Sequence, residues 1–276
     1  MKAYIVRSVI GCLAIAGSWS MQEAQGGSYN FNSTGQLDDF AKTGGNASFW
    51  AIHPGTGIGG TDSLKGVNTS TPGWMIHQQS ASVEAPFTAY IDFQWQQETV
   101  NLGYSLLVGA VSTSNYSFTL SGGTETPGMH HLVAVVHNDG TTGNNTIRVG
   151  VLQAQNITSA NIAYSDYMTL TPGSWYRLQL DFEWDGTRFD ALGSIYSLNN
   201  TTGAVTGLLE SVTRNNLLMN DLHANGVIYS AFGINGQSQN RGITGVDNFY
   251  TSVPEPSGGV LMLLGLSGVL FSRKKR

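Results

Sequence analysis

Residues 174–184, SWYRLQLDFEW, alternate polar and apolar side chains over the length of a full strand. A period of two places successive side chains on opposite faces of a β-strand, so this stretch predicts a strand with one buried face. Asp185-Gly186 follows it, and an Asp-Gly pair is typical of a tight hairpin turn. Residues 188–198 are then expected to return as the partner strand. The sequence therefore predicts an antiparallel hairpin at the centre of the fold.

Similar patterns, rich in β-branched and aromatic residues, recur on both sides of this hairpin. The expected further strands are 74–77, 87–95, 104–111, 116–120, 131–137, 146–153, 167–170, 208–213, 227–234 and 245–251. The glycine-rich stretch 55–66 is expected to be a loop, and no stretch keeps a helical period. About ten to twelve strands at regular spacing predict one all-β domain, a single antiparallel β-sandwich or jelly roll.

The composition limits the classes of function. Charged residues make up 11% of the chain, less than half of the usual quarter, and the formal net charge is −5. Because nucleic-acid binding usually needs clustered Lys and Arg, a chain without a basic stripe is not expected to bind nucleic acid. A hydrophobic content of 41% with 6 Trp is enough for a real core. The sequence therefore predicts a folded domain whose surface is solvated by hydroxyl and amide groups.

The first 26 residues are expected to be a signal peptide. Lys2 and Arg7 precede the apolar run 8–17, and small residues near Gly26 offer a cleavage site. Cleavage near residues 14–16 is an alternative, and so is a lipoprotein signal ending at Cys12. Cys12 is the only cysteine and lies in the segment to be removed. The mature chain would then have neither a disulfide nor a thiolate metal site.

The chain ends with a proline-containing segment, an apolar run and a basic cluster. Residues 253–257, VPEPS, are expected to leave the sheet as an exposed connector, because proline lacks an amide donor. Residues 258–271 carry no charge. As a helix they would be about 21 Å long, which is short for a bilayer core of roughly 30 Å. The basic residues after them are predicted to stay in the cytoplasm. They are Arg273, Lys274, Lys275 and Arg276.

The triplet Pro254-Glu255-Pro256, followed by this short apolar helix and the basic end, resembles a PEP-CTERM sorting signal. The resemblance implies export across the inner membrane of a Gram-negative bacterium, transient membrane insertion and removal of the tail by an exosortase. The product would reach the cell surface or an extracellular polysaccharide matrix. The expected division is a signal peptide 1–26, a domain 27–251 and a sorting tail 252–276. An ordinary single-pass anchor is the alternative.

A looser resemblance covers the domain itself. The hairpin with WYRL at 175–178, and VDNF at 246–249, look like the late strands of concanavalin-like jelly rolls, including laminin-G-like domains and legume lectins. Many such domains bind glycans and some bind calcium. Four tryptophans are candidates for stacking on sugar rings, with core packing as the alternative. They are Trp50, Trp74, Trp95 and Trp184. Candidate calcium ligands, with turn capping as the alternative, are Asp62, Asp139, Asp247 and Asn248.

The hairpin also offers candidate catalytic residues, because Asp181, Glu183 and Asp185 occupy alternate positions. Laminarinase-like enzymes of this fold class carry Glu-x-Asp-x-x-Glu, but Arg188 stands here where the third acid is expected. A retaining glycosidase needs two carboxyl groups about 5 to 5.5 Å apart. The broken motif predicts a protein that is not an enzyme, with Asp185 as a turn residue. The adjacent His130 and His131 would point to opposite faces of a strand, so no metal site is expected.

Together these observations predict a non-catalytic, exported protein with a structural or glycan-binding role at the cell surface or in a matrix. Its expected partners are the export machinery, an exosortase and polysaccharide, and no cofactor is expected apart from the calcium alternative. A glycoside hydrolase of the laminarinase type is the second candidate.

Overall fold

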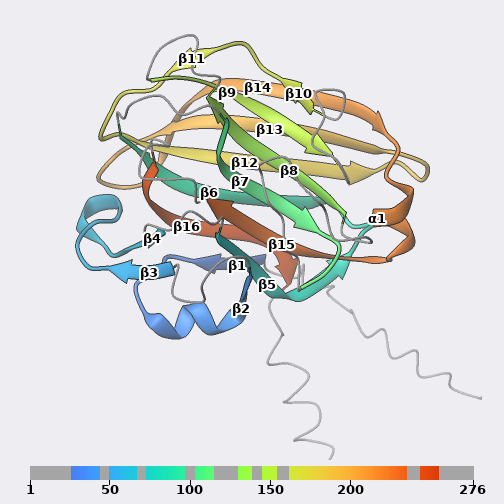
Figure 1. Cartoon of the computed structure of the whole chain (residues 1–276), viewed down its shortest axis with the longest axis horizontal. Helices are drawn as coiled ribbons and strands as arrows, with labels where there is room; N and C mark the ends of the chain where they lie inside the picture. Colours follow the sequence, from blue (N-terminus) through green and yellow to red (C-terminus); the bar gives the residue numbers. More distant parts are fainter. Residues whose placement is uncertain are drawn as a thin grey trace, which may run out of the picture.

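The computed structural model describes residues 26–43, 50–66, 73–96, 103–114, 130–138, 145–153, 162–234 and 243–254. These residues form two eight-stranded antiparallel sheets that pack face to face (Figure 1). The predicted all-β sandwich is therefore confirmed. Within the described ranges, no helix is both long enough and apolar enough to cross a membrane.

The first sheet, called sheet 1, contains the central hairpin. Its spatial order is β14 (Val205–Leu217), β13 (Phe189–Leu198), β12 (Trp175–Trp184), β6 (Phe87–Trp95), β16 (Ile243–Pro254), β4 (Ser63–Gly66) and β3 (Trp50–His53), with β1 (Gly26–Tyr29) also paired to β16. The long strands that lie side by side were predicted from their alternating patterns. The edge beyond β16 is built instead from three short strands.

The second sheet, called sheet 2, covers one face of sheet 1. Its spatial order is β10 (Ile162–Tyr164), β9 (Thr146–Gln153), β8 (His131–Asn138), β7 (Gly103–Val111), β15 (Val227–Ile234), β5 (Gly73–Ser82) and β2 (Phe40–Thr43), with β11 (Met168–Thr169) also paired to β9. Among the described residues, three short helical segments connect strands, namely η1 (Thr34–Asp39), η3 (Ile58–Gly60) and α1 (Asn220–Ala224).

The core lies between the two sheets. In β12 the side chains of Leu178, Leu180 and Phe182 point into it and are buried. Val108 and Val151 of sheet 2 belong to the same cluster. Burial of such side chains contributes about 1.5–3 kcal/mol each. The alternate residues of β12 point away from sheet 2, so the pattern that predicts the strand also creates a polar outer face on sheet 1.

The hairpin has the predicted turn. The Asp185 amide donates to the Arg188 carbonyl at 2.9 Å, and Gly186 has a φ of 100°, which favours glycine. Most of the other expected strands also form, within a few residues of their expected bounds. The expectation of a loop at 55–66 is wrong in part, because it contains η3 and β4. The expected strand 116–120 lies outside the described residues.

The expected connector at 253–257 is wrong at its first two residues. Strand β16 runs through Pro254, and the Val253 side chain is fully buried. The pairing of β16 with β1 is irregular at this point, between Gly26 and Gly27, and proline within sheets is found at such irregularities. The tail from Glu255 onward and residues 1–25 of the expected signal peptide lie outside the described residues.

Candidate functional site

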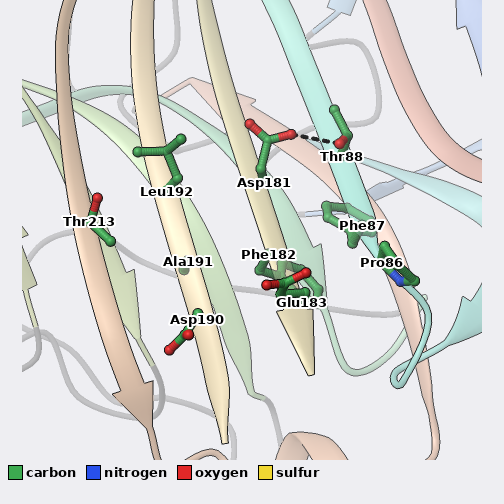
Figure 2. A pocket seen from close by; sticks show the side chains of 10 residues that line it. All are labelled: Pro86, Phe87, Thr88, Asp181, Phe182, Glu183, Asp190, Ala191, Leu192 and Thr213. Carbon is green, nitrogen blue, oxygen red and sulfur yellow. Dashed lines mark hydrogen bonds between the residues drawn. The ribbon is translucent and has the colours of Figure 1, made fainter. Parts of the chain in front are cut away.

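A groove opens on the outer face of sheet 1, at the end where β6 begins and β12 finishes (Figure 2). Its volume is about 290 Å³. The lining residues are Pro86, Phe87, Thr88, Asp181, Phe182, Glu183, Asp190, Ala191, Leu192 and Thr213. They come from Pro86 and the start of β6, and from three neighbouring strands, β12, β13 and β14.

The strand register brings these residues together. Asp181 of β12 lies opposite Thr88 on one side and opposite Leu192 on the other, and Leu192 lies opposite Thr213. Side chains in one such row share a face of the sheet. The row therefore forms a continuous strip across four strands.

Three carboxylates line the groove, namely Asp181, Glu183 and Asp190. Hydrogen bonds orient two of them. The Thr88 hydroxyl donates to Asp181 Oδ1 at 2.6 Å, as Figure 2 shows, and Gln179 Nε2 donates to Asp181 Oδ2 at 2.7 Å. The Asn216 amide donates to Asp190 Oδ1 at 2.8 Å. Each carboxylate oxygen can accept more than one hydrogen bond, so acceptor capacity is left. The groove thus presents oriented acceptors beside the apolar side chain of Leu192.

No basic residue lines the groove. The cation nearest along β12 is Arg177, and its guanidinium makes two hydrogen bonds to the buried Asp92, at 2.7 and 3.0 Å. It also lies 3.6 Å from the ring centre of Tyr90, and Tyr90 stacks on Tyr250 with ring centres 5.1 Å apart. Burial raises the pKa of Asp92, while its hydrogen bonds with Arg177 oppose that rise. The charge of Arg177 is therefore balanced within the sheet.

The three carboxylates predicted on alternate positions of the hairpin do not all line the groove. Asp181 and Glu183 line the groove, but Asp185 sits in the hairpin turn, where its Oδ1 accepts bonds from the amides of Thr187 and Arg188 at 2.7 and 2.6 Å. These backbone bonds lower the pKa of Asp185. The prediction that Asp185 is a turn residue is confirmed. Arg188 contacts Asp185 through its backbone amide.

Asp190 is the residue that the sequence reasoning missed. It lies directly opposite Glu183 across the hairpin. The register of the hairpin could have identified Asp190, since a turn centred on residues 186–187 places it directly opposite Glu183 on the partner strand.

Sugar stacking is contradicted for three of the four tryptophans, for which the core-packing alternative holds. Trp50, Trp74 and Trp95 are 5%, 1% and 1% exposed, so their rings pack inside the protein and offer no surface for a sugar. Trp50 and Trp95 belong to the core cluster between the sheets, whereas Trp74 belongs to a separate buried cluster with Ile76 and Leu107 of sheet 2. Trp184 is partly exposed, but it stacks on His223 with ring centres 4.2 Å apart.

Two of the three calcium candidates that the structure describes, Asp62 and Asp247, serve as caps, whereas Asn248 Nδ2 donates to Asp92 Oδ2 at 3.2 Å. Asp62 Oδ1 accepts a bond from the Gly55 amide at 3.1 Å. Asp247 Oδ2 accepts bonds from the Ile58 amide and the Thr61 hydroxyl at 3.1 and 3.2 Å, and burial raises its pKa to about 6. The turn-capping alternative is confirmed for both. The described part of the chain holds no cluster of three or more His, Cys, Asp or Glu residues suited to a metal ion, and Asp139 lies outside it.

Comparisons with known proteins support the fold alone. No family model matches the chain, and no curated protein matches it. Among solved structures, the carbohydrate recognition domain of Emp47p is similar with a TM-score of 0.53 at 10% identity, covering 84% of this chain and 98% of that one. Lectin UEA-II complexed with galactose has a TM-score of 0.52 at 10% identity, covering 83% and 98%. The chain therefore has a sandwich of the legume-lectin type.

Proposed function

We propose that this chain is an exported, non-catalytic protein that binds polysaccharide in the groove of sheet 1. The observation that carries the proposal is the groove itself, in which oriented carboxylates and threonine hydroxyls lie beside apolar side chains. The lectin-type fold supports it, because two of the structures with this fold are a carbohydrate recognition domain and a lectin bound to galactose.

The lining suits a sugar chemically. Asp181 and Asp190 can accept bonds from sugar hydroxyls, and the hydroxyls of Thr88 and Thr213 add further polar groups. Leu192 offers an apolar contact for the C–H face of a ring. A volume of about 290 Å³ is near the lower end of ligand pockets, which span roughly 300–1,000 Å³. A short glycan segment is the occupant that fits this size.

A hydrolase is the second candidate, because Glu183 and Asp190 face each other across the hairpin. Two carboxylates near one bond are the minimum that a glycosidase requires. Binding without catalysis is favoured because Asp185 is committed to its turn and Arg188 stands where the laminarinase-like pattern has an acid.

The sorting role rests on the tail. The Pro254-Glu255-Pro256 triplet, the apolar run and the basic end support removal by an exosortase after export from a Gram-negative cell. The protein would then act at the cell surface or in the surrounding polysaccharide matrix. The proposed binding uses no metal, so a chelator should leave glycan affinity unchanged.

A glycan array probed with the purified protein tests the binding role. We expect selective binding that weakens at least tenfold in Asp181→Asn, since a hydrogen bond to a charged group contributes about 1.5–3 kcal/mol. Asp39→Asn, an exposed position in η1, is the matched control and should bind normally. Absence of binding to any glycan, or equal affinity of Asp181→Asn, would overturn the assignment of the groove.

The same preparation tests catalysis. We expect no release of reducing sugar from β-glucans or from any glycan that the array identifies. Release that disappears in Glu183→Gln would replace the binding role with the hydrolase role.

A further inference from the structure

The groove of sheet 1 is negatively charged. Its lining includes Asp181, Glu183 and Asp190, and Figure 2 shows these side chains on the neighbouring strands β12 and β13. Within the described ranges, none of the three forms an ion pair. The groove therefore presents three carboxylates whose charges are not balanced by a direct contact with a described cation.

The arginines of the same strands are directed elsewhere. Arg177 is bonded to Asp92, and Arg188 serves the hairpin turn with its backbone amide. Successive side chains of a strand alternate between faces, so Arg214 lies on the face of β14 opposite to that of Thr213, which lines the groove. The negative charge thus belongs to an open site and is not part of an internal network of ion pairs.

Two of the carboxylates oppose each other directly. Glu183 and Asp190 are cross-strand partners in the register of β12 and β13. Like charges in directly opposed positions destabilise a sheet. A cation bound between these two side chains would remove that repulsion, so the pair is more stable with a positively charged ligand than without one.

The lining suits an organic cation better than a metal ion. Calcium takes six to eight oxygen ligands, and the described part of the chain has no cluster of three or more His, Cys, Asp or Glu residues that could hold a metal. The groove also offers the apolar side chain of Leu192 and the hydroxyls of Thr88 and Thr213. An ammonium group on a sugar ring can donate charge-assisted hydrogen bonds to carboxylates, and these are about twice as strong as neutral ones.

We propose that the groove selects a polysaccharide whose sugars carry free amino groups. An ammonium group lies at Glu183 and Asp190, and Asp181 accepts bonds from neighbouring sugar hydroxyls. This inference rests on the glycan-binding role proposed above and adds the chemical class of the glycan. Polysaccharides that carry uronate or sulfate groups are excluded by repulsion between like charges. N-acetylation removes the positive charge of the amine, so acetylated amino sugars bind weakly.

Calorimetry with two matched oligosaccharides tests the class. An oligomer of glucosamine and an oligomer of N-acetylglucosamine, of equal length and linkage, differ only in acetylation. We expect the glucosamine oligomer to bind at least tenfold more tightly, because its bonds to the carboxylates are charge-assisted. Added salt should weaken this binding severalfold through screening, and polygalacturonate should not compete. Equal affinity for the two oligomers, or competition by polygalacturonate, would overturn the inference.

The glycan array separates failure of this inference from failure of the binding role. Binding of an uncharged glycan in preference to the glucosamine oligomer, with affinity that depends on Asp181, would leave the binding role standing and remove the amine preference. Absence of binding to every glycan would reject both.

The variant Glu183→Gln tests the opposed pair. We expect the Tm of the free protein to rise by about 1–4 °C, because repulsion from Asp190 is removed. We also expect the affinity for the glucosamine oligomer to decrease at least fivefold. Asp39→Asn makes the same change of charge at an exposed position and should alter neither quantity.

Two outcomes of these measurements would contradict the role of the pair. One is a Glu183→Gln variant with a lower Tm or with unchanged affinity for the glucosamine oligomer. The other is a parent protein whose Tm rises with calcium chloride and not with the glucosamine oligomer, since this would assign the carboxylates to a metal ion.

Discussion

Arg177 is the residue that allows Asp92 to be fully buried as a carboxylate. The two groups form two hydrogen bonds, and Arg177 is itself only 15% exposed. Removing one partner of a buried pair typically costs about 3–5 kcal/mol, because the other charge is left unpaired. We therefore expect Arg177→Ala to lower the free energy of unfolding by about 3 kcal/mol or more in urea denaturation.

Two further variants test whether the loss of stability comes from the Arg177–Asp92 pair or from the loss of any arginine. Arg177→Lys should recover only part of the stability, since lysine cannot make the two parallel bonds of a guanidinium. Arg188→Ala should change it by less than about 0.5 kcal/mol, because Arg188 contributes its backbone amide to the turn. Equal effects of the two alanine variants would contradict the stabilising role of the Asp92 pair.

Asp247 gives the fold a pH dependence of known sign. Its pKa rises from 3.8 to about 6, mainly through burial, with Asp92 on the neighbouring strand adding to the rise. Between these two values the folded state binds more protons than the unfolded state, so stability decreases as pH rises from about 4 to about 6. At 1.36 kcal/mol per pKa unit, the loss is at most about 3 kcal/mol.

The variant Asp247→Asn should lack this dependence. We expect its stability relative to the parent to improve by up to about 3 kcal/mol between pH 4 and pH 7, measured by urea denaturation at each pH. The comparison is necessary because burial lowers the pKa of His131 to about 3, which gives the parent an opposite trend below pH 6.5. A constant difference between parent and variant would show that Asp247 titrates normally.

At the scale of the element, the face of the strand on which a leucine lies determines how much its side chain contributes to stability. Leu180 of β12 is fully buried, whereas Leu208 of the edge strand β14 is 56% exposed. We expect Leu180→Ala to lower stability by about 2–5 kcal/mol through lost burial and a cavity. Leu208→Ala should stay within about 0.5 kcal/mol. A larger loss at Leu208 in thermal or urea unfolding would mean that β14 is covered in solution.

Strand length explains which elements the sequence could predict. The central strands β6, β12 and β13 each carry a full alternating pattern, and their bounds were close to those observed. The short strands β1 to β4 have only four residues each. Such stretches contain too few periods to be distinguished from loops, and they become strands because long partners such as β16 and β5 lie beside them.

At the scale of the whole molecule, the sandwich could be predicted and the groove could be predicted only in part. Asp181 and Glu183 were selected because they alternate on one strand. Asp190 was missed because its place depends on the hairpin register, and the burial of Trp95 could not be predicted because period two does not say which face of a strand is buried. The pairing of Gly26 with Pro254 joins residues from opposite ends of the sequence, which no local pattern contains.

The central claim is that the groove of sheet 1 holds a glycan, and a hydrogen-exchange footprint tests it most directly. The protein would be measured free and saturated with its best glycan from the array. The account predicts slower exchange in peptides covering 86–88, 181–183 and 190–192, with exchange unchanged at η1. Saturating binding that slows exchange elsewhere and leaves these three peptides unchanged would contradict it.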